Sequence, residues 1–156
     1  MNPVLAQYEK MKRWPLGEWL FARAVCARAP YFGSIKPKFL ELKPGKVVVK
    51  IQNRRSVQNH IGTIHAIALC NAAEMAAGVG MEASLPKDWR WIPKGMTVQY
   101  LAKCQISATA TATFTLPESV EGGYDCIVAV AITDEDGTKV AHADINMYLT
   151  PKPKKA

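Results

Sequence analysis

A chain of 156 residues, of which 49% are hydrophobic, is long enough to bury the core of one domain without disulfides or structural metals. No stretch approaches the ~20 consecutive apolar residues of a membrane span, and no apolar segment of a secretory signal is present, so we expect no membrane partner. The formal charge of +7 fits an anionic partner, with the basic residues scattered apart from a cluster near the C-terminus. Because no helix-turn-helix, zinc-finger or ribonucleoprotein motif is present, we expect a phosphate-bearing small molecule and no nucleic acid.

The cysteines are widely spaced, lie in apolar segments and form no C-x-x-C pair. They are Cys26, Cys70, Cys104 and Cys126. Buried free thiols fit this pattern better than disulfides or a zinc site, which favours a reducing, cytoplasmic location.

The N-terminal part predicts two helices followed by a hairpin. Asn2 before Pro3 is a helix start signal, and apolar residues recur at helical spacing up to Pro15. A second helical segment covers residues 16–28 and ends before Pro30. Residues 34–42 and 46–53 have the texture of strands, joined by a Pro-Gly turn. We expect the two helices to lie on a core that the rest of the chain forms.

Residues 59–85 predict a long central helix, because they are mostly Ala with other apolar residues interspersed. After a loop at 86–93, strands are expected at 94–104, 106–115, 124–133 and 139–149. The second of these is the clearest, because Ser or Thr occupies every odd position from Ser107 to Thr115 with Ala and one Phe between them. The apolar run at 127–132 predicts a strand that is central or covered on both faces.

The resulting order, β-β-α-β-β-β-β after short helices, predicts an α+β fold in which a six-stranded antiparallel sheet curls around one helix. We expect a single domain over residues 1–150, including an N-terminal helical segment at 1–30, and a basic tail at 151–156.

Several kinds of catalytic site are excluded or disfavoured by missing motifs. The chain has no G-x-S-x-G elbow. Residues 78–83 match G-x-G-x-x-A but lie at the end of the predicted helix, where a dinucleotide site does not form. His60 and His65 do not form an H-E-x-x-H motif, so no metal site is expected.

The start of the predicted helix and one carboxylate inside it remain as candidate chemistry. Glu74 is the only residue between 59 and 81 certain to be ionised, so it faces either solvent or a site. Asn59 is a plausible helix cap, and His65 is expected either to be a hydrogen-bonded residue of the core or to hold the loop in place. Free N–H groups at a helix start bind anions or oxyanions. Ala66 and Glu74 are eight residues apart, ~12 Å along a helix, so to act on one carbonyl they must come from two chains.

The run N-H-I-G-T-I-H-A-I-A-L-C-N-A-A-E at 59–74 resembles the signature of hotdog-fold acyl-CoA thioesterases. It is similar to N-x-x-G-x-x-H-G-G followed by an acidic residue, as in the phenylacetate-pathway and 4-hydroxybenzoyl-CoA types. Residues 29–37 and 90–103 also resemble a bacterial hotdog group that carries only an unknown-function domain label. The resemblance spans nearly the whole chain and implies the hotdog fold.

The resemblance also implies roles for individual residues. Glu74 falls where the family holds its catalytic Asp or Glu, acting as base or nucleophile. Asn59 matches an Asn that holds the substrate carbonyl or the attacking water. Ala66, preceded by His65, matches a Gly whose backbone N–H polarises the thioester carbonyl. In the family this carboxylate and this amide come from opposite subunits, which implies a homodimer or a dimer of dimers. The chain departs from the pattern where His65-Ala66-Ile67 replaces H-G-G, and the nearest match to a family hydroxyl is Thr97.

The expected function is therefore hydrolysis of an acyl-CoA thioester, with coenzyme A present only as part of the substrate and no further cofactor. Candidate contacts to the coenzyme A phosphates are Arg54, Arg55, Lys94 and Lys103. Candidate walls of an acyl pocket at a dimer interface are Met75, Met96 and Tyr100. Two alternatives stay open, a non-catalytic acyl-thioester or lipid binder and a hotdog hydratase or dehydratase.

Overall fold

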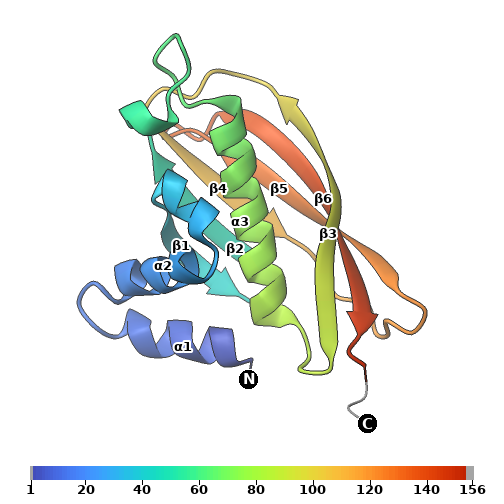
Figure 1. Ribbon diagram of the computed structural model, residues 1–156. Coiled ribbons are helices and arrows are strands. Elements are labelled where there is room, and N and C mark those ends of the chain that lie inside the picture. The colour runs from blue at the N-terminus through green and yellow to red at the C-terminus, as the bar shows by residue number, and fades with distance from the viewer. Residues whose placement is uncertain (1, 154–156) are drawn as a thin grey trace.

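The computed structural model describes residues 2–153, which fold as one antiparallel sheet curled around a long helix (Figure 1). The strand order across the sheet is β1-β2-β4-β5-β6-β3, the order of a hotdog fold. The strands are β1 (Lys38–Lys43), β2 (Lys46–Gln52), β3 (Trp89–Tyr100), β4 (Ser107–Thr113), β5 (Tyr124–Thr133) and β6 (Lys139–Pro151). The predicted order of elements and fold class are confirmed, and β1 and β3 form the two edges.

The central helix, α3 (Ala66–Ser84), lies on the concave face of the sheet, and 14 of its 19 residues are buried. Its small side chains explain how it comes so close to the strands. A Cβ placed on Gly80 would lie 2.8 Å from a methyl group of Val47 on β2 and 3.1 Å from the Phe114 ring. The absence of a side chain at Gly80 therefore lets the helix approach β2 closely at this point.

The alternation predicted for β4 is present in the structure. Ala108, Ala110 and Ala112 are fully buried under α3, whereas Thr109 and Thr111 are half-buried on the outer face. The apolar run of β5 is central, as predicted, but it is covered on one face only, because Ile127 on the outer face is exposed.

Four predicted boundaries are wrong, one of them the end of the strand expected at 94–104, which lies at Tyr100. The central helix begins at Ala66 and not at residue 59, because Gly62 has a φ of +81°, which a right-handed helix does not accommodate. Residues 34–35 belong to a 3-10 helix, η1 (Pro30–Ile35), and β1 starts only at Lys38. The loop expected at 86–93 is largely strand, because β3 starts at Trp89. Pro93 is tolerated there because β3 is an edge strand whose register shifts between Pro93 and Gly95.

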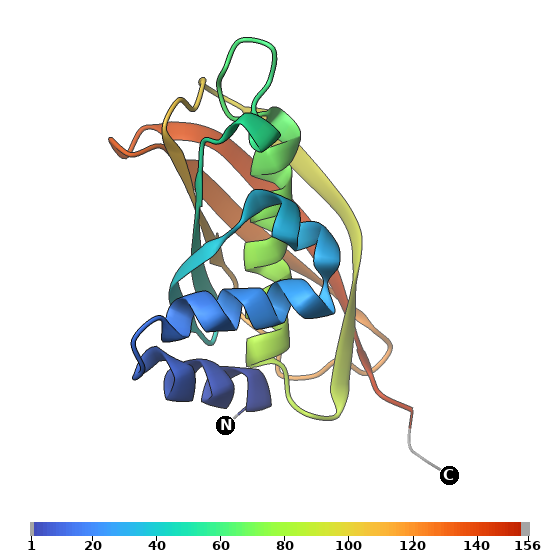
Figure 2. The same ribbon diagram turned by 60° about the vertical axis from the view of Figure 1, so that its left-hand side comes forward.

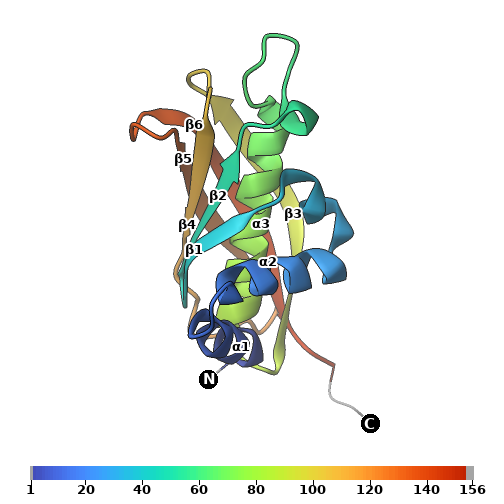
Figure 3. The ribbon, with the colours of Figure 1, turned by 90° about the vertical axis from the view of Figure 1, so that its left-hand side faces the viewer.

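Two N-terminal helices, α1 (Pro3–Lys12) and α2 (Gly17–Arg28), pack against each other and against β1, and α1 also contacts α3 (Figures 2 and 3). Edge-to-face contacts of Phe21 with Tyr8 and with Phe39, each 5.1 Å between ring centroids, join the two helices to β1. Of the expected basic tail, Pro151 completes β6, and residues 154–156 lie outside the described part of the chain.

A further short 3-10 helix, η2 (Arg55–Val57), leads from β2 toward the start of α3. All four cysteines are free, as expected from their spacing. No helix of the described residues is both long enough and apolar enough to cross a membrane.

Candidate functional site

His65 caps the start of α3, a role that the sequence had suggested for Asn59. The His65 backbone is extended, and its Nδ1 accepts a hydrogen bond of 3.0 Å from the Ile67 N–H. The His65 N–H in turn donates to the Val57 carbonyl at 2.8 Å. These bonds hold the first turn of α3 against the segment that follows β2.

Asn59 organises the loop that precedes the helix. Its Oδ1 accepts from the N–H groups of Ile61 and Thr63, both at 3.1 Å, and its Nδ2 donates to the Thr63 hydroxyl at 2.7 Å. The Asn59 backbone adds two further bonds, to Thr63 and Gly62. Asn and Asp side chains compete with the helix for backbone groups in this way, which explains why the chain turns here.

The Ala66 N–H is left without a partner. Neighbouring amides are used, because Ile67 donates to His65 Nδ1 and Ala68 donates to the His65 carbonyl. Within residues 2–153, no hydrogen-bond acceptor meets the Ala66 N–H, and the residue is half-exposed. A free N–H at the positive end of a 19-residue helix is suited to stabilise negative charge on a substrate oxygen.

Glu74 is the one exposed residue of α3 between Ala68 and Met81. Four residues before it, the Cys70 thiol lies 3.1 Å from the Tyr100 hydroxyl; four residues after it, Gly78 packs against the Trp91 ring. Glu74 therefore lies between two contacts of α3 with β3, opposite the middle of that strand. Among the described residues it has no hydrogen bond or ion pair, so the carboxylate is free to meet a ligand or a second chain.

The proposed pocket walls fall in two places. Met96 and Tyr100 pair with the buried residues Ile145 and Ala141 of β6, so they face α3 from the inner side of β3, and both are exposed. Met75 is fully buried between helix and sheet, where it belongs to the core and presents no surface. The hydrogen bond to Cys70, followed by burial, raises the pKa of Tyr100.

The proposed cationic residues are also separated. Arg54 donates to the Ser56 hydroxyl and to the Ser34 carbonyl, and Arg55 beside it is exposed. Lys94 lies on the outer face of the sheet, 3.0 Å from Asp125 and 4.3 Å from the centre of the Tyr148 ring. Arg54 and Arg55 thus lie on the same side as the start of α3, whereas Lys94 lies away from it. Residues 2–153 contain no cluster of three His, Cys, Asp or Glu side chains that would hold a metal ion.

A small pocket beside the first turns of α3 contains a residue that sequence reasoning missed. The pocket has a volume of about 250 Å³ and is lined by η1, by residues 56–58 and by His65, Ile67, Ala68 and Asn71. Asn71 is 6% exposed; its Nδ2 donates to the Ser34 hydroxyl at 3.1 Å, but its Oδ1 has no partner in the structure. The signal in the sequence was a lone amide in an apolar helix, but its unpaired oxygen depends on neighbours far along the chain.

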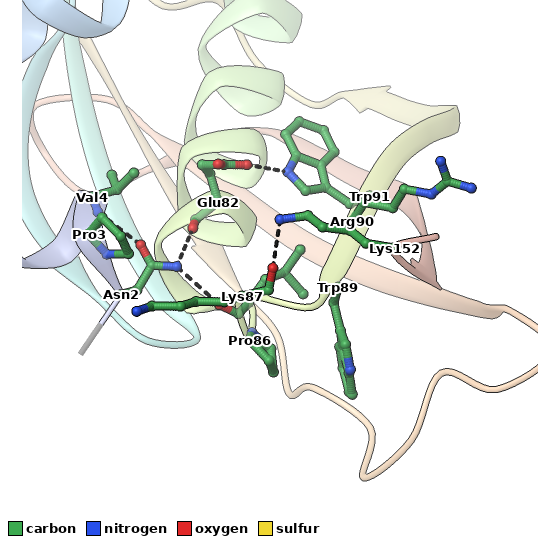
Figure 4. A pocket seen from close by; sticks show the side chains of 11 residues that line it. Asn2, Pro3, Val4, Glu82, Pro86, Lys87, Trp89, Arg90, Trp91 and Lys152 are labelled. Atoms are coloured by element: carbon green, nitrogen blue, oxygen red, sulfur yellow. Dashed lines mark hydrogen bonds between the residues drawn. The ribbon is translucent and has the colours of Figure 1, made fainter. Parts of the chain in front are cut away.

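The other end of α3 forms a pocket of about 280 Å³ in which Asn2, Glu82 and Lys152 already have hydrogen-bond partners (Figure 4). Asn2 donates to the carbonyls of Glu82 and Leu85, at 2.8 and 3.0 Å, and the Trp91 indole donates to Glu82 at 2.9 Å. The side chains of Lys87 and Arg90 extend in opposite directions (Figure 4). These groups do not converge on a common point. The hydrogen bonds at this end tie the helix to the N-terminal segment and to β3, and we assign them a structural role.

Comparison with known proteins agrees with this fold. The family described as Domain of unknown function (DUF4442) matches residues 17–149. The structural-genomics protein APC5556 is 40% identical, with 94% of this chain and 97% of that chain covered and a TM-score of 0.81. No curated protein matches the sequence.

Two more distant structures share the fold. PA5026 from Pseudomonas aeruginosa, described as a probable thioesterase, is 22% identical, with 83% of this chain and 93% of that chain covered and a TM-score of 0.74. Thioesterase HI1161 from Haemophilus influenzae is 11% identical, with 82% and 87% covered and a TM-score of 0.71. Thioester hydrolysis is thus an activity named for proteins of this fold.

Proposed function

The chain belongs to the DUF4442 family of domains of unknown function, and we propose that it hydrolyses an acyl-CoA or related acyl thioester to a free acid and a thiol. The proposal rests on two polar groups of α3 that have no hydrogen-bond partner within the chain. The Ala66 N–H at the start of α3 has no acceptor, and the Glu74 carboxylate is exposed and unpaired.

In the proposed reaction, the Glu74 carboxylate removes a proton from water, which attacks the thioester carbonyl carbon. The oxygen that becomes negative accepts a hydrogen bond from the Ala66 N–H. The C–S bond then breaks, the carboxylic acid forms, and the proton reaches the departing thiolate. Direct attack by the carboxylate, followed by hydrolysis of the anhydride, uses the same two groups.

The two groups must come from two copies of the chain, because ~12 Å of helix separates them within one copy. A two-fold axis passing near Cys70, midway between Ala66 and Glu74, would set each Ala66 against the other subunit's carboxylate. The exposed β3 edge supports such an assembly. It is 12 residues long and its backbone groups face solvent, which is a template for pairing with a second β3.

The pocket beside the first turns of α3 supports a substrate site at the same end. It lies next to His65 and to the turn that carries Ala66, and exposed Tyr31 and Ile67 give it apolar surface for part of a substrate. Arg54 and Arg55 directly precede Ser56, which lines the pocket, and Arg54 donates to the carbonyl of Ser34, a second lining residue. We assign the phosphates of coenzyme A to this side of the molecule.

The test is thiol release from short-chain, long-chain and aromatic acyl-CoAs by wild type and by Glu74→Gln. We expect the variant to lose 10²- to 10⁴-fold in kcat, on the order of a general base, and to keep its fold because Glu74 is exposed. Glu82→Gln is the matched control, because Glu82 is an exposed carboxylate on the same helix that is bonded to Trp91. If wild type binds an acyl-CoA but releases no thiol from any of them, the protein is a silent binder and the hydrolase proposal is wrong.

A further inference from the structure

The turn between α1 and α2 exposes four large apolar side chains within seven residues. Trp14 is 67% exposed, Leu16 75%, Trp19 54% and Leu20 44%. Single exposed apolar residues are ordinary on a soluble protein, but a contiguous group of this kind marks a contact surface. The turn projects from one side of the molecule, beyond the edge of the sheet (Figures 1 and 2).

The backbone holds this turn in one conformation. A Cβ on Gly17 would collide with the Met11 carbonyl, so α2 starts in direct contact with the end of α1. The N–H of Trp14 donates to Met11 at 2.9 Å, and the N–H of Gly17 donates to Trp14 at 3.0 Å. Leu16 has a φ of +63°, which is unfavourable for a branched residue, and yet its side chain gains no burial in return. The Leu16 carbonyl accepts from the Leu20 N–H at the start of α2, but the Leu16 side chain adds no packing to the fold.

Almost all of the net charge of the chain is located here. Residues 10–38 contain seven Lys or Arg and a single acid, Glu18, which gives +6 of the total of +7. The remaining residues hold 13 basic and 12 acidic side chains and are nearly neutral. The basic residues alone are spread along the chain. The positive charge of residues 10–38 becomes visible only when the acidic residues, which are nearly absent there, are counted as well.

The charges and the apolar residues share one continuous surface. Lys12, Trp14, Leu16, Trp19, Lys36 and Lys38 line one hollow of about 630 Å³. Trp14 also borders a hollow with Lys10 and Leu20, and Trp19 borders one with Arg23. The Arg23 guanidinium lies 5.1 Å from the Trp19 ring. We call this surface, with Arg13 of the turn, the N-terminal face.

We propose that the N-terminal face binds the surface of an anionic lipid bilayer, with Trp14 and Leu16 at the level of the headgroups. Indole rings favour the membrane–water interface, and lysines and arginines beside them are attracted to anionic headgroups. A short projecting turn can enter a soft surface, whereas a stable protein–protein contact needs an extended complementary face. The expectation of no membrane partner rested on the lack of a membrane-spanning segment. Peripheral binding to a bilayer surface requires no such segment, and none is found among the helices of the described residues.

The test is co-sedimentation of the full-length chain with vesicles of phosphatidylcholine alone or with about three-tenths phosphatidylglycerol. We expect at least tenfold tighter binding to the anionic vesicles at about 0.1 M salt and loss of binding at about 0.5 M salt. Trp14→Ala with Leu16→Asn is expected to weaken binding at least tenfold. Asn is chosen because it tolerates positive φ and keeps the turn.

Charge is tested separately with the double variant Lys12→Glu, Lys36→Glu. Each cation lost should weaken binding about fivefold, so the double variant should bind more than 25-fold more weakly, because it also adds two negative charges. Two controls carry the same kinds of change elsewhere on the surface. Ile127→Asn replaces an apolar residue of similar exposure, and Lys87→Glu with Lys139→Glu reverses two exposed charges. Both controls are expected to bind like wild type.

Three results would overturn the proposal. Equal binding to neutral and anionic vesicles, or none to either, excludes a headgroup site. Equal losses in the control charge variant would show attraction by net charge alone. A smaller oligomer for Trp14→Ala with Leu16→Asn in light scattering, with vesicle binding unchanged, would assign the face to a second copy of the chain. None of these readouts depends on thioester hydrolysis, so the two proposals fail independently.

Discussion

The two ends of α3 differ in how their polar groups are satisfied. At the C-terminal end, Asn2 donates to the carbonyls of Glu82 and Leu85, and Trp91 donates to the Glu82 carboxylate, so groups from elsewhere in the chain bind the last turns (Figure 4). At the N-terminal end, the Ala66 N–H and the buried Asn71 Oδ1 have no partner in the structure, and Glu74, near the middle of the helix, is exposed and unpaired. The same helix is closed at one end and left open at the other.

This difference separates what stabilises the fold from what is available for chemistry. A buried polar group without a partner costs about 1–3 kcal/mol, so folding alone gives no reason to leave one. At the closed end, substitutions should change stability and leave activity unaltered. At the open end they should do the opposite, and the following predictions test that division.

After Glu74→Gln, the largest expected effect comes from Ala66→Pro, which removes the one unpaired N–H of the open end. Proline is favoured at the first position of a helix, and the extended backbone of His65, with ψ of 139°, suits the residue before a proline. We therefore expect unchanged or slightly higher stability together with a 10²- to 10³-fold loss in kcat, the usual effect of removing an oxyanion donor. The measurements are thiol release and urea denaturation on the same preparation.

Ala66→Ser is the control for this experiment, because it changes the side chain and keeps the N–H. It should retain most of the activity. If Ala66→Pro hydrolyses acyl-CoA as fast as wild type, the amide has no part in the reaction, even if Glu74 does.

A moderate effect on stability alone is expected from Asn2→Ala at the closed end. The Asn2 side chain accepts from the Val4 N–H at the start of α1 and donates to two carbonyls at the end of α3. Its loss should cost about 1–2 kcal/mol in the free energy of unfolding and leave kcat unchanged. Asn2→Ser keeps a cap for α1 but is too short to reach the carbonyls of α3, so its stability should lie between those of wild type and Asn2→Ala. If Asn2→Ala is as stable as wild type, the hydrogen bonds at the end of α3 do not stabilise the fold.

Local sequence patterns predicted those parts of the fold that depend on neighbours along the chain. The alternation in β4 and the turn before β2 are examples, since each is determined within a few residues. The start of α3 was placed seven residues too early, because Gly62 breaks a run that composition alone assigns to helix. The start of β3 was missed because Pro93 reads as loop unless the strand is known to be at an edge.

The candidate site was predictable only in part, for the same reason. A single charge in an apolar helix identified Glu74 as exposed or functional, and the structure shows it exposed. That it faces the inner side of β3 depends on contacts of Cys70 with Tyr100 and of Gly78 with Trp91, which no local pattern contains. Likewise, the unpaired state of Asn71 depends on Ser34, 37 residues earlier in the chain.

A small effect on stability is also expected from Asn71→Leu, although this residue is buried, and its small size is the informative result. The substitution loses one hydrogen bond to Ser34, but it also removes a buried oxygen that has no partner, and Leu has a similar volume. We expect the free energy of unfolding to rise or fall by no more than about 1 kcal/mol. Asn59→Leu is the matched control, because that amide uses both its oxygen and its nitrogen in the loop and its loss should cost about 2 kcal/mol or more. Equal losses in the two variants, measured by urea denaturation, would mean that Asn71 Oδ1 is satisfied in solution and that the open end of α3 is less open than the structure indicates.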